Sequence, residues 1–508
     1  MCELLAPAGN IESLDAAIGE GADAVYLGLK SFNARLRTSN FAWNQFEAAV
    51  GAVHRLGKKI YVTVNTVCEE KETERLYRFL AYLDRIHPDG LIVQDLGIVR
   101  MCQEFFPGLE LHASTQMNVE SAAAANLLYQ EGIKRVVLAR ELGFDEIKYI
   151  KEHTKAEIEM FVHGALCVSE SGLCLFSSYL GGKSANRGMC AQACRRYYTA
   201  EYPEGIKQGY YFSPCDLQLI EHIPELCDLG IESFKIEGRM KSAEYVGSVV
   251  AAYRYVIDHY KEDRKGAVAT GKRMLASDFA RSKTSYWYGF KDVKDGVENA
   301  GSKILNPNQA GGTGIYLGTV SRVKKAPDGL IEEVKNNASP DADPSSLRIQ
   351  MAMLAGGNYD PDPGDSIRLH RRDDTGRTSH KVRSVEIDDD GHRWIDIPLS
   401  HRIGDSVYLL QIKSMSKRYP KILPGDLSKF RKQPADEKLP FLDVTPVENR
   451  ELSYFPDGLY VQVSTIEDIF LAQAFHPVRL IVEFTCDTRY DLLNGKTVLP
   501  FSKKSIYI

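Results

Sequence analysis

The chain has 508 residues, with 63 Lys and Arg against 68 Asp and Glu, and a formal charge of −5. Its 44% hydrophobic and 26% charged residues are ordinary for a globular protein, which excludes a disordered or fibrous chain. No apolar run approaches the ~18–20 residues of a membrane-spanning helix, and the N-terminus lacks a secretory signal. We therefore expect a cytoplasmic protein with no membrane partner. Any nucleic-acid-binding surface must be local, because the overall charge is mildly acidic.

The first 240 residues alternate short apolar runs with helical patterns. The runs are Glu3–Ala8, Ala24–Gly28, Lys59–Asn65, Gly90–Asp95, Glu110–Ser114, Arg135–Arg140, Glu157–Gly164 and Ser233–Glu237. Such runs are typical of strands that are buried on both faces. Eight of them alternating with helices predict a (β/α)8 barrel, an α/β fold. A doubly wound open sheet is the alternative, but no G-x-G-x-x-G fingerprint follows the first run.

Polar residues follow most of these predicted strands. They are Gly9-Asn10, Asn65, Gln94-Asp95, Ser114-Thr115-Gln116, Arg140-Glu141, His163-Gly164 and Glu237-Gly238-Arg239. In a barrel, the segments after the strands form the face that carries the active site. For any single residue, a simple emergence into solvent explains the polarity equally well. Together, the polar ends indicate a site at this face.

Four segments are expected along the chain. Residues 1–265 form the barrel with its cysteine cluster, 266–300 a helical connector, and 301–415 a small antiparallel β-barrel domain. Residues 416–508 form a linker and a partial α/β domain. The Gly311–Gly314 motif leads into β-type patterns, whereas Asn337–Ser346 reads as a polar linker or mobile loop. The β-α-β pattern that starts beyond residue 455 stops at Ile508 before it completes a domain, so we expect a fragment of a longer protein.

A cysteine-rich insertion separates the seventh and eighth predicted strands. Its spacing is Cys167-x6-Cys174-x15-Cys190-x3-Cys194, which offers four thiolates for structural zinc or for an iron–sulfur cluster. Only the last pair has a spacing common in zinc sites, and Cys167 follows a strand end at the expected barrel mouth. These features favour iron–sulfur over zinc, with buried free thiols as a third possibility. Cys215 could replace one of the four ligands.

Hydrolase motifs are missing from the sequence. There is no H-E-x-x-H zinc helix and no G-x-S-x-G elbow. A Cys167–His163 pair lacks an orienting third group. The run Arg195-Arg196-Tyr197-Tyr198 combines phosphate-pairing charge with stacking rings, which predicts an RNA contact. A solvated charged face with core tyrosines is an equally good interpretation.

Four stretches together resemble the collagenase-like U-32 peptidase family. They are Glu159–Ser177 with its two cysteines, Leu5-Ala6-Pro7-Ala8-Gly9, Asn186–Arg195 with the other two cysteines, and Lys235-Ile236-Glu237-Gly238-Arg239-Met240-Lys241-Ser242. The resemblance covers roughly residues 1–410. The length and the later β-domain look most like the long branch of the family, which includes a bacterial ribosomal-RNA cytidine hydroxylase.

The resemblance implies an activity different from the family's label. Its better-understood bacterial members are oxygen-independent hydroxylases that use prephenate as oxygen donor and an iron–sulfur cluster. The expected function is therefore the formation of a 5-hydroxypyrimidine in rRNA or tRNA, with iron–sulfur assembly proteins as accessory partners. Cys167, Cys174, Cys190 and Cys194 become the expected ligands of a 4Fe-4S cluster. A collagenase-like peptidase and a zinc-stabilised RNA-binding module are the alternatives.

Further residues receive expected roles from motif and strand-end position. Arg140, Arg239 and Arg187 are expected to bind substrate, because guanidinium groups pair with carboxylates in a bidentate manner. His163 and His112 are the expected proton-transfer groups, because histidine titrates near neutral pH. Glu237 is the third expected catalytic residue. One departure from the family pattern is Cys215, which stands where many long relatives have a lysine.

Overall fold

The computed structural model describes residues 2–36, 40–203, 205–275, 281–289, 304–307, 315–336, 348–357, 360–372, 376–411, 419–430, 458–463, 466–482 and 506–507. The Gly311–Gly314 motif and the expected linker at Asn337–Ser346 lie outside these ranges. The chain separates into two compact units, Met1–Leu439 and Pro440–Ile508, which are described one at a time. The expected segment boundaries near 265, 300 and 415 stay predictions.

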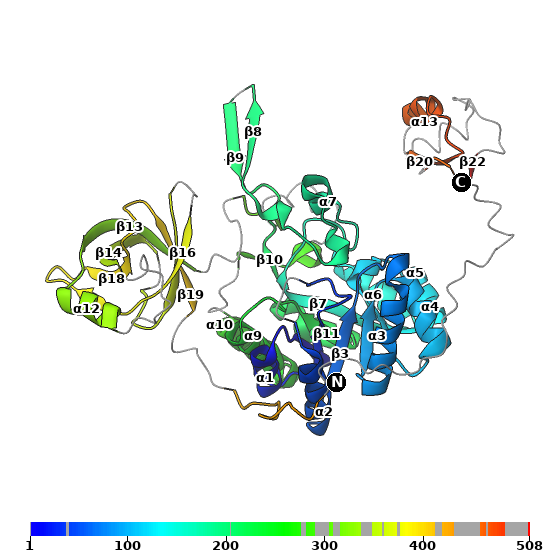
Figure 1. Cartoon of the computed structure of the whole chain (residues 1–508), viewed down its shortest axis with the longest axis horizontal. Helices are drawn as coiled ribbons and strands as arrows, with labels where there is room; N and C mark the ends of the chain where they lie inside the picture. Colours follow the sequence, from blue (N-terminus) through cyan, green and yellow to red (C-terminus); the bar gives the residue numbers. More distant parts are fainter. Residues whose placement is uncertain are drawn as a thin grey trace. The chain divides into compact units, whose positions relative to one another are not determined.

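A closed barrel of eight parallel strands forms the first part of the chain (Figure 1). Its strands are β1 (Glu3–Pro7), β2 (Ala24–Leu27), β3 (Lys59–Val64), β4 (Gly90–Val93), β5 (Leu111–Ala113), β6 (Ile133–Val137), β7 (Glu157–Ala165) and β11 (Ser233–Ile236). Each strand pairs with the next one along the chain, and β11 closes the ring by pairing with both β7 and β1. The predicted (β/α)8 barrel is confirmed.

Helices alternate with these strands. They are α1 (Ile11–Gly19), α2 (Trp43–Arg55), α3 (Thr73–Ile86), α4 (Leu96–Phe105), α5 (Ala122–Gln130), α6 (Phe144–His153), α8 (Ile223–Leu229) and α9 (Ala243–His259). Two polar strand-end residues serve as helix N-caps. The Asn10 side chain accepts a hydrogen bond from the backbone N–H of Ser13, and Asp95 accepts one from that of Gly97. At these two positions, helix capping explains the polarity.

Alternate residues of the strands fill the barrel interior, as the two-residue period of a strand requires. A buried apolar layer crosses the interior and comprises Leu5, Ala24, Tyr26, Tyr61 and Ile92. Charged side chains lie toward the amino ends of the strands, in what we call the lower half of the barrel. The residues at and after the carboxyl ends of the strands form what we call the barrel mouth. Polar groups therefore lie on both sides of the apolar layer.

The insertion between β7 and α8 carries the cysteines. Its elements are α7 (Phe176–Gly181), η3 (Ala185–Arg187), η4 (Ala193–Arg195), the hairpin strands β8 (Tyr198–Tyr202) and β9 (Gly205–Gly209), and β10 (Asp216–Gln218). The hairpin projects away from the barrel (Figure 1). Strand β10 runs antiparallel to the carboxyl end of β7 and is followed on its other side by β12 (Lys283–Thr284). Helix α10 (Arg264–Leu275) follows α9 and packs against it.

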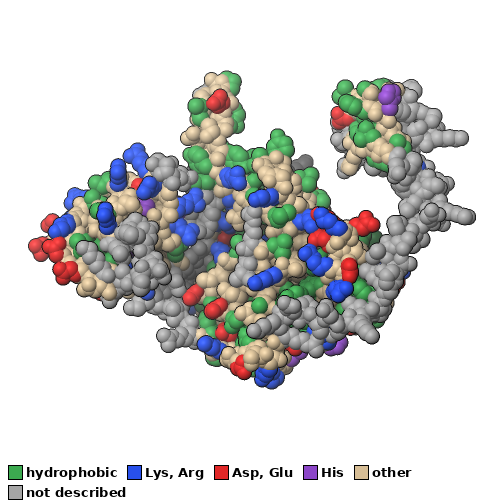
Figure 2. All heavy atoms as spheres, viewed as in Figure 1, with side chains coloured by type: hydrophobic (Ala, Val, Ile, Leu, Met, Phe, Trp, Pro, Cys, Tyr) green, Lys and Arg blue, Asp and Glu red, His purple; other side chains and the backbone are tan. Residues whose placement is uncertain are grey.

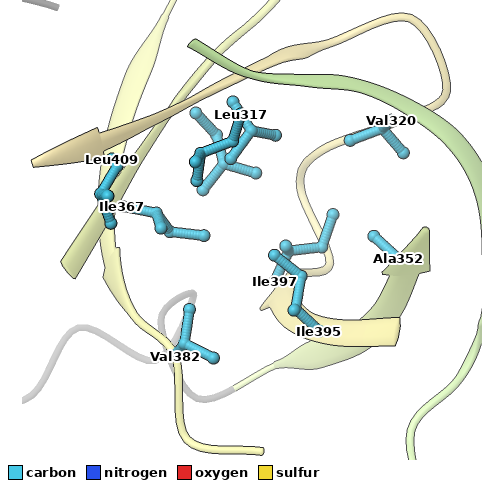
Figure 3. Close-up of a cluster of buried hydrophobic side chains, with 10 residues drawn as sticks. Leu317, Val320, Ala352, Ile367, Val382, Ile395, Ile397 and Leu409 are labelled. Carbon is cyan, nitrogen blue, oxygen red and sulfur yellow. The ribbon is translucent and has the colours of Figure 1, made fainter. Parts of the chain in front are cut away.

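A seven-stranded antiparallel sheet follows in the order β16-β15-β19-β13-β14-β18-β17. Its strands are β13 (Ile315–Lys325), β14 (Ile349–Gly356), β15 (Ser366–His370), β16 (Arg377–Lys381), β17 (Val385–Ile387), β18 (Arg393–Pro398) and β19 (Ser406–Gln411), with α12 (Asp328–Asn336) after β13. Side chains from these strands meet in one hydrophobic core that includes Leu317, Ile367, Ile397 and Leu409 (Figure 3). Among the described residues, the end strands β16 and β17 do not pair, so the sheet curls around this core without a closing ladder.

The second unit contains a small parallel sheet. Strands β20 (Tyr460–Val463), β21 (Arg479–Val482) and β22 (Ile506–Tyr507) pair side by side, and α13 (Ile466–Gln473) connects the first two. This agrees with the β-α-β pattern in the sequence. In the described parts of both units, no helix combines the length and the apolar composition that crossing a membrane requires.

Candidate active site at the barrel mouth

A charged group lies at the mouth, on the ends of β11 and β2. The Glu237 carboxylate accepts hydrogen bonds from Arg35, at 3.2 Å, and from the Tyr26 hydroxyl, at 3.2 Å. The same hydroxyl lies 2.9 Å from the Ile236 carbonyl oxygen. Burial raises the pKa of Glu237, but the positive charges of Arg35 and Arg239 outweigh burial and lower it. Glu237 is therefore held as a carboxylate in a fixed orientation.

Arg239 is a buried cation in the same group. Its side chain donates a hydrogen bond of 2.8 Å to the Thr63 hydroxyl and lies 5.9 Å from the centre of the Tyr26 ring. Among the described residues, no carboxylate lies within 4 Å of its guanidinium. Burial and the neighbouring charge of Arg35 lower the pKa of Arg239 to about 10. Such a guanidinium can bind a further anion, because the opposite charge that acts on it, that of Glu237, lies beyond 4 Å and is shared with Arg35.

Neutral amides lie across the mouth from this charged group. The Asn65 amide donates to the Ser114 hydroxyl at 3.4 Å, and the Gln94 amide to the Gln116 carbonyl oxygen at 3.5 Å. The side-chain oxygens of Gln94 and Gln116 are buried without a hydrogen-bond partner. Because an unpaired buried acceptor is costly, these oxygens are available to a donor on a bound molecule.

One arm of the insertion is fixed to the ends of β5 and β6. The Ser171 hydroxyl lies 3.1 Å from the Arg140 guanidinium and 3.0 Å from the Glu141 carboxylate. Gly172 approaches the backbone of Gln116 so closely that a Cβ atom would lie 2.0 Å from its carbonyl oxygen, and its φ is +80°. Only glycine fits there, so the Cys167–Cys174 loop is seated on the mouth.

The other arm is fixed to the loop after β3. The Arg187 guanidinium pairs with Glu72 at 2.8 Å and with Glu69 at 3.2 Å. Between the two arms, Arg195 donates to the Leu166 carbonyl oxygen and to the Ser213 hydroxyl, both at 2.8 Å. Arg187 and Arg195 thus hold the insertion in place, and the expected roles of Arg187 in substrate binding and of Arg195 in RNA binding stay predictions.

The four cysteines of the insertion lie close enough to influence one another. Burial raises the pKa of the Cys194 thiol to about 11, with further contributions from Cys167, Cys190 and Cys174 and an opposing one from Arg195. Gly188, two residues before Cys190, lies against the loop that carries Arg35, since a Cβ atom added to it would lie 2.5 Å from the Asn33 carbonyl oxygen. The cysteine set and the charged group at the mouth are therefore neighbours.

Four thiols suit either of the two expected metal centres. Zinc–sulfur bonds of ~2.3 Å place the sulfurs of a tetrahedral site about 3.8 Å apart. Among the described residues, no three of these sulfur atoms lie within 4.8 Å of one another. In a 4Fe-4S cluster, by contrast, each thiolate binds a different iron. The identity of the metal centre stays a prediction.

Two further cysteines have other neighbours. Cys215 is buried. Burial and the charge of Asp216 raise the pKa of its thiol, against the opposing charges of Arg195 and Arg281. Cys227, on α8, exchanges a hydrogen bond with Cys2, just before β1. Cys215 lies beside the Asp216–Arg281 ion pair of 2.6 Å, and its expected role as a substitute ligand stays a prediction.

The two histidines occupy unexpected positions. Strand β7 contains a bulge, because Lys235 of β11 pairs with Phe161 whereas the next residue, Ile236, pairs with His163. The extra residue of β7 interrupts the inward–outward alternation of its side chains. The His163 ring consequently packs against Tyr253 and Tyr245 of α9, with Nδ1 3.2 Å from the Tyr253 hydroxyl. His112 is fully buried in the lower half, where Nε2 lies 2.9 Å from the Glu110 carboxylate. The proton-transfer roles expected for both histidines stay predictions.

Sequence reasoning missed three members of the charged group. Tyr26 reads as an ordinary strand residue, Thr63 as a buried β-branched residue, and Arg35 as one of several loop cations. The available signal was the two-residue alternation of strands, because it places the side chains of Tyr26 and Thr63 on the inner face of two neighbouring strands. Arg35 gave no signal, because its contact with Glu237 spans 202 residues of sequence.

This geometry defines a class of protein, a (β/α)8 barrel with a thiol-bearing insertion over its mouth. The sequence profile of peptidase family U32 matches residues 9–298, more than half of the chain. The chain belongs to this family, as the cysteine and strand-end motifs indicated.

Three named relatives illustrate the range of the family. The tRNA hydroxylation protein P1 of Bacillus subtilis is 40% identical over 275 residues, which cover 52% of this chain and 65% of that protein. The 23S rRNA 5-hydroxycytidine C2501 synthase of Escherichia coli is 42% identical over 265 residues, 52% of this chain and 40% of that protein. The collagenase of Porphyromonas gingivalis is 36% identical over 307 residues, 57% and 73% respectively. The match with the first two relatives thus spans less than two thirds of their length.

Proposed function

We propose that this protein is an enzyme that hydroxylates RNA, forming a 5-hydroxypyrimidine in transfer or ribosomal RNA. The proposal includes an iron–sulfur cluster on Cys167, Cys174, Cys190 and Cys194 and prephenate as the oxygen donor. Two relatives carry names that refer to the hydroxylation of tRNA or rRNA. An RNA substrate would place the protein in the cytoplasm, where iron–sulfur assembly proteins would be its accessory partners.

The observation that carries the proposal is the proximity of the cysteine set to the charged group at the mouth. The segment of Cys190 lies against the loop that carries Arg35, Arg35 pairs with Glu237, and the charges of both act on Arg239. When bound, a cluster at these thiols would supply electron transfer. Arg239 would bind one carboxylate of the oxygen donor, since its guanidinium has no carboxylate within 4 Å among the described residues.

The remaining residues of the mouth would orient the two substrates. Glu237, held by Arg35 and Tyr26, is an ionised acceptor beside Arg239 and can take up a proton. The unpaired side-chain oxygens of Gln94 and Gln116 can accept hydrogen bonds from a nucleobase. In this arrangement, the anionic donor would meet the charged group and the base would meet the amides.

The test combines metal analysis with nucleoside mass spectrometry. Protein purified without oxygen should contain about four iron per chain, as expected for four thiolate ligands of one cluster. A deletion strain should lose a 5-hydroxypyrimidine from its rRNA or tRNA, and the wild-type chain but not Cys167→Ser should restore it. Cys102→Ser, a buried cysteine of α4 outside the set, is the matched control. One zinc per chain together with unchanged modification would overturn the proposal.

A collagenase-like peptidase is the second candidate, favoured by the name of the Porphyromonas gingivalis relative. The pure chain would then cleave gelatin, and cleavage would survive Cys167→Ser if no cluster is required. A zinc-stabilised RNA-binding module would bind RNA, but it would neither modify the RNA nor cleave gelatin. The three outcomes are distinct.

A further inference from the structure

The insertion presents exposed aromatic residues outside its packed base. Phe176, Tyr198 and Phe212 pack against one another, with ring centres 5.3–6.3 Å apart, and so join α7 to the foot of the β8–β9 hairpin. The Tyr198 hydroxyl donates to the Ala193 carbonyl oxygen next to Cys194. This aromatic base fixes the hairpin relative to the cysteine set.

Further aromatic side chains lie on the outer side of this base. Tyr179 of α7 is 87% exposed, Tyr202 of β8 is 51% exposed, and Tyr197 is 50% exposed. We call these three residues the aromatic rim. Figure 2 shows hydrophobic side chains over the hairpin and the adjoining surface of the insertion. Exposed rings are unfavourable in water, so three of them on one insertion, Tyr197 beside Tyr210 and Tyr202 beside Lys207, indicate a projecting part that another molecule covers.

Cations accompany the rim. The Lys207 ammonium lies 5.1 Å from the centre of the Tyr202 ring, and the exposed Arg196 directly precedes Tyr197. Lys183 is exposed just after α7. Rings with cations beside them suit a chain that alternates flat bases with phosphates, because bases stack on aromatic faces and phosphates pair with cations.

We propose that the aromatic rim binds the unpaired loop of an RNA stem-loop and leads its target base to the barrel mouth. This inference rests on the proposed function and deepens it, since it names where the RNA binds and which form it has. A base can reach a barrel mouth only when it is unstacked, and unstacking costs least where the base and its neighbours are already unpaired, as in a loop. The hairpin, with strands of five residues, reaches about 17 Å from its foot, which suits contact with several nucleotides.

The test measures RNA binding by the full chain, purified without oxygen, with fluorescence anisotropy. The probes are a labelled RNA stem-loop with a seven-nucleotide loop and a fully paired RNA duplex of equal length. We expect the stem-loop to bind more tightly than the duplex. The double variant Tyr197→Ala/Tyr202→Ala should weaken stem-loop binding about 10- to 100-fold, because each stacked base depends on one ring. Tyr202→Phe keeps the ring and should bind like the wild type.

Matched controls come from the helices of the barrel wall, outside the insertion. Tyr129 of α5 and Tyr149 of α6 are 42% and 58% exposed, and Tyr129→Ala/Tyr149→Ala should change binding less than twofold. Iron content and the urea midpoint of each variant verify that the fold and the cysteine set are intact. Lys207→Ala should reduce the salt dependence of binding by about one phosphate contact.

The results separate this inference from the proposed function. Equal binding of duplex and stem-loop, no binding of either, or wild-type binding by the rim variant would each overturn the rim. Capture of a protein by the rim in place of RNA would overturn it too. If the protein contains iron and modifies RNA but its RNA binding does not depend on the rim, only the inference about the rim would be overturned. Rim-dependent RNA binding without iron or modification would overturn only the hydroxylase.

Discussion

The lower half of the barrel and its mouth both bury charged side chains, but they treat these charges differently. In the lower half, Glu159 is fully buried and lies 2.8 Å from the Lys235 ammonium and 3.4 Å from the Arg135 guanidinium. Arg135 also pairs with Glu157 at 2.9 Å. Each charge there has opposite charges beside it. At the mouth, Arg239 lacks a carboxylate within 4 Å among the described residues.

The difference teaches how to distinguish a structural charge from a functional one. In a closed ion network every charge already has an opposite charge beside it. Removing one member should therefore destabilise the fold, and the network has no charge left over for a ligand. A buried charge without an ion-pair partner is already unfavourable. Its removal should therefore change the unfolding free energy little and weaken ligand binding. Four substitutions test this contrast.

Glu159→Gln should have the largest effect, on stability. It leaves the ammonium of Lys235 and the guanidinium of Arg135 without their shared buried carboxylate, and breaking such a network costs about 3–5 kcal/mol of unfolding free energy. Urea denaturation measures the loss. The control Glu104→Gln removes a surface pair with Arg100 and should cost less than about 1 kcal/mol. Equal losses in the two variants would contradict the contrast.

Arg239→Met should act on activity instead. The unfolding free energy should stay within about 1 kcal/mol of the wild type, because an apolar side chain replaces a buried charge that has no carboxylate partner among the described residues. The amount of 5-hydroxypyrimidine restored in a deletion strain should fall about 100-fold, as expected for a lost charge-assisted contact to a carboxylate. A variant that is unstable yet fully active would reverse the assignment of Arg239.

Arg35→Met should have a smaller effect and move the pH profile. Arg35 opposes the burial of Glu237 and lowers its pKa, so the pKa of Glu237 should rise in the variant. The acidic limb of activity should then move to higher pH, while activity at the optimum falls about tenfold through the freer orientation of Glu237. An unshifted limb would exclude Glu237 as the group that must be ionised.

Glu110→Gln should have the smallest effect, confined to acidic stability. Burial raises the pKa of Glu110, but hydrogen bonds from His112 and Lys134 lower it from 4.5 to about 2. The stability that this carboxylate contributes is present above its unfolded pKa and is lost as the pH falls from about 5 toward 2. Partial exposure limits it to about 1 kcal/mol. Wild type and variant should therefore differ at pH 7 and converge near pH 2.

The barrel could be predicted from the sequence because its signal is local. Each of the eight strands is a continuous apolar run, and each helix follows with its own period, as for β4 and α4. Long-range partners left no such signal. The pairing of Glu159 with Lys235, and that of Glu237 with Arg35, follow only once the ring has closed.

Only part of the candidate site could be proposed from the sequence, and its arrangement could not. Cys167 and Cys174 stood out by spacing, whereas the anchors Ser171 and Arg187 depend on contacts with distant loops. His163 illustrates the limit, because alternation along β7 predicts an inward side chain. One extra residue in the strand turns its ring toward α9. A bulge of this kind has no sequence signature comparable to a run or a period.

The two anchors of the insertion connect the arrangement of its four thiols to the closed barrel. Arg187 holds the Cys190 segment on the loop after β3, and Ser171 holds the Cys167–Cys174 loop on the end of β6. These attachment points lie in separate sectors of the ring that β11 closes by pairing with β7 and β1. The relative placement of the four thiols therefore depends on parts of the barrel that are far apart in the sequence, although the thiols themselves lie within one short insertion.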